Sequence, residues 1–186
     1  MDLKNYLKIK KKIPPNVNLL AVSKGFKSQE IKIIHNSGQI DFGESKFQEG
    51  FEKQKILKDL TDIKWHFIGR IQSNKIRKIV QNFDYIHSVD SYQKLEKISN
   101  IAYEENKKPI IMLQVKLSDD PNKVGFDPNL LLEKWKLLDI CHFLNLSLLI
   151  ILDDKKVDAR WHLFSLLIKA TPTNCFLSAF LDIIKK

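Results

Sequence analysis

The 186-residue sequence predicts an α/β fold of the (β/α)8, TIM-barrel-like class, incomplete at its C-terminal end. Short apolar runs alternate with longer stretches whose apolar residues recur every three or four positions, which indicates strands followed by helices. The strand-like runs recur about every 20 to 30 residues with single helices between them, so the strands should be parallel. A complete barrel needs roughly 250 residues, so the last βα units should be missing.

The predicted elements follow one another in simple order. Seven strands are expected at 18–23, 40–43, 64–69, 85–89, 109–117, 146–152 and, weakly, 175–178. Helices are expected at 28–36, 46–58, 73–82, 92–106, 128–144 and 157–169. No Gly-rich phosphate loop follows a strand, which disfavours a nucleotide-binding doubly wound sheet. We therefore predict one domain over 1–186, with a helix and loop at 1–17 and a barrel at 18–186.

Residues that favour helix starts support these boundaries. Ser73 and Ser91 are expected N-caps, and Asp127 precedes a proline at the first helical position. Ser28 is also an N-cap candidate, but Ile31 stands where a capping box needs a carboxylate.

Composition restricts the function classes. With 44% apolar and 28% charged residues the chain has an ordinary globular composition, which excludes disordered and collagen-like classes. The net charge of +9 comes from 28 lysines and only three arginines. Because arginine is the usual residue for bidentate phosphate and base recognition, this bias does not indicate nucleic-acid binding. We predict no nucleic-acid partner.

Cysteine content and apolar runs bear on the compartment. Cys141 and Cys175 form neither a CxxC pair nor a zinc spacing, so no disulfide framework is indicated. The basic N-terminal segment is not followed by an apolar signal region, and no run is long enough to span a bilayer. The expectation is a cytoplasmic protein without a membrane partner.

Ligands of a parallel αβ barrel bind at the carboxyl ends of its strands. The side chains expected there are Lys24, Glu44, Ser45, Arg70, Ser88, Asp90, Lys116, Lys123, Asp153 and Asp154. Lys24 ends the run LLAVSK, and a desolvated lysine at this rim would be able to form an imine with an aldehyde. Taken alone, a lysine at a strand end is more often a solvated surface residue.

Five segments change this interpretation. They are AVSK (21–24), DFGES with QEG (41–50), WHFIGRIQSNK (65–75), IHSVDS (86–91) and LQVKLSDDPNKVGF (113–126). In order and spacing they resemble the pyridoxal phosphate homeostasis protein family over about residues 18–126. The resemblance implies the barrel of the alanine racemase N-terminal domain, pyridoxal 5′-phosphate (PLP) held as a Schiff base, and no known catalysis.

The resemblance also implies site residues. Lys24 would carry the Schiff base, and Ser45 stands where the family has an asparagine near the cofactor. His66 and Ser88 fall in the third and fourth segments, and Ser178 matches part of a C-terminal phosphate segment. A core histidine bonded to backbone is the alternative for His66. No catalytic residue and no metal ligand is expected.

The C-terminal part departs from the family pattern. Only Leu177 and Ser178 match the family's seventh-strand segment, and Phe180 replaces a glycine. Loss of phosphate contacts should weaken PLP binding, and a missing eighth strand should leave open sheet edges. The sequence favours a monomer, with dimerisation through the exposed barrel edge as the alternative.

Three functions remain. The first is a non-catalytic PLP-binding protein of intracellular vitamin B6 homeostasis, whose partners are PLP and PLP-requiring apoenzymes. The second is a degenerate paralogue that has lost PLP binding. The third is a PLP-dependent amino-acid racemase, which would need a second acid or base that the sequence does not identify.

Overall fold

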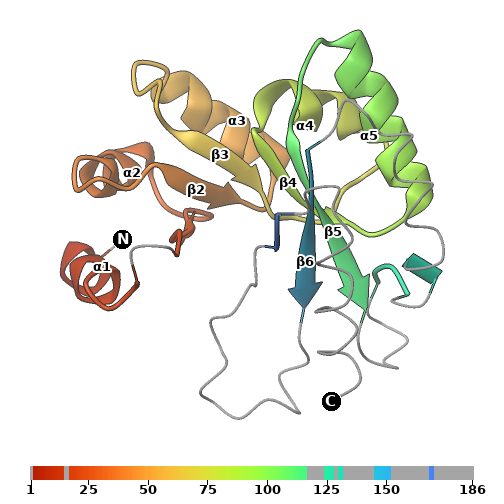
Figure 1. The fold of residues 1–186 in the computed structure, drawn as a ribbon. Helices are drawn as coiled ribbons and strands as arrows, with labels where there is room; N and C mark the ends of the chain where they lie inside the picture. The colour runs from red at the N-terminus through yellow and green to blue at the C-terminus, as the bar shows by residue number, and fades with distance from the viewer. Residues whose placement is uncertain are drawn as a thin grey trace, which may run out of the picture.

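The computed structural model describes residues 2–14, 17–116, 124–127, 130–131, 145–151 and 168–169. Their strands form one sheet in sequence order: β1 (Ala21–Val22), β2 (Asp41–Glu44), β3 (Lys64–Phe67), β4 (Tyr85–Val89), β5 (Ile110–Lys116), β6 (Asn145–Ile151) and β7 (Ile168–Lys169). The helices are α1 (Leu3–Lys10), α2 (Ser28–His35), α3 (Phe47–Ile56), α4 (Ile76–Asn82) and α5 (Tyr92–Glu104). Strands β1 to β6 are parallel, with α2 to α5 connecting β1 to β5 (Figure 1). This arrangement confirms the predicted incomplete barrel.

The hydrophobic core lies between the helices and one face of the sheet. Phe42 on β2 is opposite Trp65 on β3, and their rings are 6.2 Å apart. Ile86 and Ile111 pair on the same face between β4 and β5. The helices cover this face with buried side chains at helical spacing: Ile31, Ile34, Ile76, Ile79, Leu95 and Ile98. Burying each of these side chains contributes about 1.5–3 kcal/mol, so this interface is a main source of stability for the described part of the fold.

Side chains alternate along each strand, so intervening residues lie on the other face of the sheet. Register places Gly43 opposite His66, and His66 opposite Tyr85. Val22 also belongs to this face and is 42% exposed. In a complete barrel this would be the inner face.

Helix starts agree only partly with the sequence predictions. Ser91 is the N-cap of α5, and Asp127 Oδ1 accepts from the Leu130 N–H, as an N-cap does. The N-cap of α2 is Lys27 rather than Ser28, and Glu30 accepts the Lys27 N–H at 2.8 Å. A capping box needs its carboxylate three residues after the N-cap. Glu30 is only two residues after Ser28 but three after Lys27, so the prediction placed the N-cap one residue too late.

The predicted start of the fourth helix at Ser73 was also wrong. The first residues form a turn in which Lys75 N–H donates to the Gln72 carbonyl, and α4 begins at Ile76. A single tight turn of this i→i+3 type often precedes a helix, so the helical bonds begin later than the serine suggests.

The first strand is shorter than predicted. Gln39 Nε2 donates to the Leu19 carbonyl, so a side chain supplies a partner for this backbone group before the ladder begins at Ala21. Such side-chain bonds offer backbone groups an alternative to the sheet.

One of the C-terminal strands also differs from the prediction. Ile168 and Lys169, predicted at the end of a helix, form β7 and pair antiparallel with Leu148 and Ser147. A pairing of two residues is set by tertiary contacts rather than by local periodicity, which explains the error. The predicted strand at 175–178 lies outside the described residues, as does most of the predicted helix at 128–144.

Candidate functional site

Lys24 lies on a tight turn directly after the first strand. The Phe26 N–H donates to the Ser23 carbonyl at 3.1 Å, so Lys24 and Gly25 are the two central residues. Gly25 has φ +79°, the left-handed value that a type II turn requires at its third position. The Lys24 side chain is exposed. The turn thus presents an amine at the carboxyl end of β1, where ligands of parallel barrels bind.

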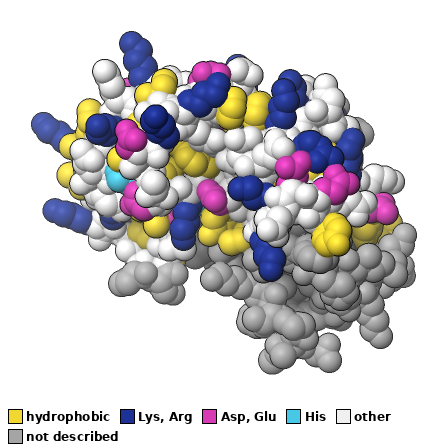
Figure 2. Space-filling model, turned by 90° about the horizontal axis from the view of Figure 1, so that it is seen from above, with side chains coloured by type: hydrophobic (Ala, Val, Ile, Leu, Met, Phe, Trp, Pro, Cys, Tyr) yellow, Lys and Arg dark blue, Asp and Glu magenta, His cyan; other side chains and the backbone are white. Residues whose placement is uncertain are grey.

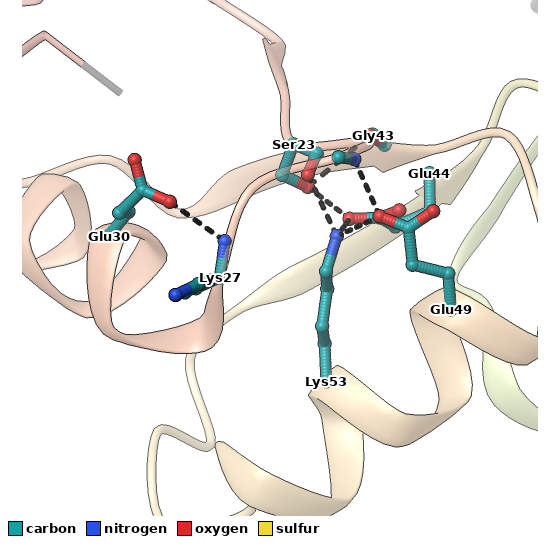
Figure 3. Close-up of polar contacts among 8 residues, drawn as sticks. Ser23, Lys27, Glu30, Gly43, Glu44, Glu49 and Lys53 are labelled. Atoms are coloured by element: carbon teal, nitrogen blue, oxygen red, sulfur yellow. Dashed lines mark hydrogen bonds and ion pairs between the residues drawn. The ribbon is translucent and has the colours of Figure 1, made fainter.

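A largely buried group of polar and charged residues lies beside this turn; we call Ser23, Glu44, Glu49 and Lys53 the Lys53 cluster (Figure 3). Lys53, on α3, donates through Nζ to Glu44 Oε1 at 2.8 Å and to Glu49 Oε1 at 2.6 Å. Its third hydrogen bond goes to the Ser23 carbonyl at 2.8 Å. The ammonium group therefore uses all three of its donors inside the protein.

The carboxylates of the Lys53 cluster make further contacts. Ser23 Oγ donates to Glu44 Oε1 at 2.6 Å, and the Gly25 N–H donates to Glu49 Oε1 at 2.5 Å. The hydrogen bonds from Lys53 and Gly25 lower the pKa of Glu49. Glu44 Oε2 is buried and has no hydrogen-bond partner among the described residues. With both carboxylates ionised the cluster holds one more negative charge than positive.

The loops after β2 and β3 meet the end of β4 at Gly69. A Cβ built on Gly69 would lie 1.9 Å from the Ser45 carbonyl oxygen, so only glycine allows this approach. Ser88 Oγ donates to the Gly69 carbonyl, and Ser88 is 9% exposed. These contacts hold the ends of three strands against one another.

A chain of three polar side chains crosses the opposite face of the sheet. Asp41 Oδ1 lies 3.0 Å from His66 Nε2, and His66 Nδ1 lies 2.9 Å from His87 Nε2. The imidazole of His66 stacks on Tyr85 with centroids 4.0 Å apart. The Asp41 carboxylate can only accept, which assigns the Nε2 proton to His66. In the neutral tautomer that carries this proton, Nδ1 of His66 accepts from His87 Nε2–H, whereas a protonated His66 would donate from Nδ1 to His87 Nε2.

His87 should make stability depend on pH. Burial, with a smaller effect from His66, lowers the pKa of His87 from 6.5 to about 3. Below pH 6.5 the unfolded chain takes up a proton that folded His87 does not, so stability falls as pH falls. Between pH 7 and pH 5 this one group should remove about 2 kcal/mol of unfolding free energy.

Urea unfolding at pH 7 and pH 5 tests this expectation with His87→Gln, which should show a smaller loss than the wild type. His35→Gln is the matched control, because His35 is bonded to exposed Asp62 in another part of the fold. Equal pH dependence in the wild type and His87→Gln would contradict the expectation.

The structure brings some of the sequence-predicted site residues together. Ser45 and Ser88 both approach Gly69, whereas His66 lies on the inner face with Asp41 and His87. His66 is bonded to side chains, not to backbone as in the alternative interpretation. Ser178 lies outside the described residues. The site-residue assignment as a whole remains a prediction.

Sequence reasoning missed three residues of this region. Lys53 was not predicted to belong to the site. Glu49 precedes it by four residues, which is the spacing of an ion pair on a helix and could have indicated this contact. Asp41 and His87 were noted only within longer segments, and nothing in the sequence indicated their link to His66. Among the described residues there is no group of metal-ligating side chains and no helix of sufficient length and apolarity to cross a membrane.

The fold and the strand-end lysine define a class of protein. Residues 3–152 match the family described as alanine racemase, N-terminal domain, and the chain belongs to that family. Solved alanine racemases share the fold: that of Clostridium difficile 630 aligns with a TM-score of 0.65 over 79% of this chain and 38% of its own, at 15% identity.

Several curated proteins are more similar to this chain than the alanine racemases are, and they confirm its resemblance to pyridoxal phosphate homeostasis proteins. The protein of that name from Synechocystis sp. is 47% identical over 121 residues, 65% of this chain and 56% of the relative. The one from Pseudomonas aeruginosa is 40% identical over 115 residues, 62% and 50% of the two chains. The chain thus spans about half the length of these curated relatives.

A solved structure similar to this chain is that of PipY from Synechococcus elongatus. Its structure without PLP aligns with a TM-score of 0.78 at 40% identity, over 81% of this chain and 71% of that chain. The structure of PipY with PLP bound aligns with a TM-score of 0.76 at 38% identity, over 81% and 70%.

Proposed function

We propose that this chain binds PLP through Lys24 and serves intracellular PLP homeostasis without catalysis. The observation that carries the proposal is the position of Lys24, exposed on a fixed turn at the carboxyl end of the first barrel strand. PipY, which has this fold, has been solved with PLP bound. The amine of Lys24 would add to the PLP aldehyde and release water, leaving a C=N bond.

The residues present fit the aldehyde end of PLP. Lys24 is exposed, and its ammonium has no hydrogen-bond or ion-pair partner among the described residues. The described phosphate candidates are weaker, because the hydroxyl of Ser88 is already bonded to Gly69. Half-buried Ser45 and, by the family resemblance, Ser178 are the remaining predicted contacts.

The charge pattern of the surface does not indicate a large anionic partner. Lysines and arginines are interspersed with acidic residues on the face in Figure 2, rather than gathered into one basic surface. We propose cytoplasmic PLP and PLP-requiring apoenzymes as the partners, with the chain acting as a monomer.

Chemical trapping tests the proposal. The protein is mixed with PLP, its visible spectrum is recorded, and borohydride then reduces the C=N bond for peptide mass mapping. We expect the label on Lys24 and its loss in Lys24→Ala. No imine absorbance, or label spread over many of the 28 lysines, would instead support a degenerate paralogue.

Absence of catalysis is tested separately. A racemase of this fold would need a second acid or base opposite the lysine. We expect no interconversion of D- and L-amino acids by the PLP-loaded protein, and measurable turnover would overturn the non-catalytic assignment.

A further inference from the structure

Both peptide groups that flank the Lys24 Cα are bound by side chains of α3. The carbonyl of the Ser23–Lys24 peptide accepts from Lys53 Nζ at 2.8 Å. The N–H of the Lys24–Gly25 peptide donates to Glu49 Oε1 at 2.5 Å. Lys53 and Glu49 are themselves joined at 2.6 Å (Figure 3). One ion pair therefore bridges the two sides of Lys24.

The rest of the Lys53 cluster fixes this ion pair to the sheet. Glu44, at the end of β2, is fully buried and binds both Lys53 Nζ and Ser23 Oγ. Ser23 N–H also donates to the Gly43 carbonyl at 2.9 Å, which anchors the start of the turn to β2. The turn is therefore held from the strand side and from the helix side.

Stability alone does not explain why charged residues occupy the Lys53 cluster. Burying charges incurs a desolvation penalty, and apolar residues of similar size are often equally or more stabilising. The cluster also contains a buried carboxylate oxygen, Glu44 Oε2, without a hydrogen-bond partner among the described residues. Charged hydrogen bonds fix the direction of the two peptide groups that flank Lys24, which apolar contacts would not do.

We propose that Glu49 and Lys53 are positioning residues, which hold the backbone of Lys24 so that its amine meets the PLP aldehyde in one orientation. The inference deepens the PLP binding proposed above and rests on it. Fixing a reacting group in advance reduces the entropy lost when the bond forms, and misplacement by about 1 Å can cost roughly 100-fold in rate.

Glu49 is the residue to vary, because its side chain is 31% exposed and its loss leaves Lys53 paired with Glu44. Glu49→Ala removes the acceptor for the Gly25 N–H, whereas Glu49→Gln keeps an acceptor oxygen. Glu52→Ala is the matched control: Glu52 is an acidic residue of the same helix that contacts Gln48 and Lys55.

Two measurements separate positioning from folding. Hydrogen exchange of the Gly25 amide, without PLP, should be faster in Glu49→Ala than in the wild type, Glu49→Gln and Glu52→Ala. Borohydride trapping with PLP should label Lys24 about tenfold more slowly in Glu49→Ala, with near wild-type rates in Glu49→Gln and Glu52→Ala. Thermal midpoints should be similar, so that loss of folded protein does not explain the slower labelling.

The outcomes distinguish the two proposals. Wild-type labelling of Lys24 that Glu49→Ala leaves unchanged overturns the positioning role alone, as does unchanged exchange of the Gly25 amide. A wild type with a protected Gly25 amide but no selective labelling of Lys24 overturns the proposed function, and the positioning role with it.

Discussion

Replacing Gly69 by alanine is expected to lower the unfolding free energy by about 3 kcal/mol or more, since overpacked sites of this kind cannot relax cheaply. The new Cβ would lie 1.9 Å from the Ser45 carbonyl oxygen and 2.6 Å from its carbonyl carbon. Both atoms are backbone, so relief requires the loops after β2 and β3 to separate. Ser88, bonded to the Gly69 carbonyl, would be displaced with them.

Urea unfolding measures the effect, with Gly25→Ala as the control. Gly25 has φ +79°, but no atom lies within 4 Å of the place that a Cβ would take, so its substitution costs only backbone strain of about 1–2 kcal/mol. Gly69→Ala should be clearly less stable than Gly25→Ala. A midpoint for Gly69→Ala equal to that of Gly25→Ala would show that the loops can separate at little cost.

The barrel could be predicted because each strand and helix of the first part carries its own period. Phe42 and Ile86 lie in short apolar runs, and the buried isoleucines of α2 and α4 recur at helical spacing. The antiparallel β7 could not be predicted in this way. It pairs only two residues with β6, and so short a pairing leaves no period to detect.

The part of the site that could be predicted is the set of residues that directly follow the strands. Lys24 was expected at a strand end, and the structure places it on the turn after β1. The partners of this region were not predictable, because Lys53 reads as an ordinary surface lysine of an amphipathic helix. Its burial depends on how α3 packs against β1 and β2, which is tertiary information. The link from His66 to His87 likewise depends on the register of β3 and β4.

Lys53→Met is expected to destabilise the fold by about 3–5 kcal/mol, the usual cost of removing one partner from a buried ion pair. The substitution removes the only cation in hydrogen-bond contact with the cluster's carboxylates among the described residues. Glu44 is fully buried and would then hold a charge with only Ser23 Oγ as a donor. Methionine has a similar length, so lost packing should contribute little.

The double variant Lys53→Met, Glu44→Gln shows how much of the destabilisation comes from the unpaired charge of Glu44. Neutralising Glu44 removes the uncompensated buried charge, so the double variant should regain a large part of the stability lost in Lys53→Met. Lys55→Met, on the same helix but 55% exposed, should change stability by less than about 1 kcal/mol. Chemical denaturation of the four proteins at pH 7 gives the comparison. If the double variant is as unstable as Lys53→Met, the loss comes from the hydrogen bonds of Lys53 to the Ser23 carbonyl and to Glu49 rather than from the unpaired Glu44 carboxylate.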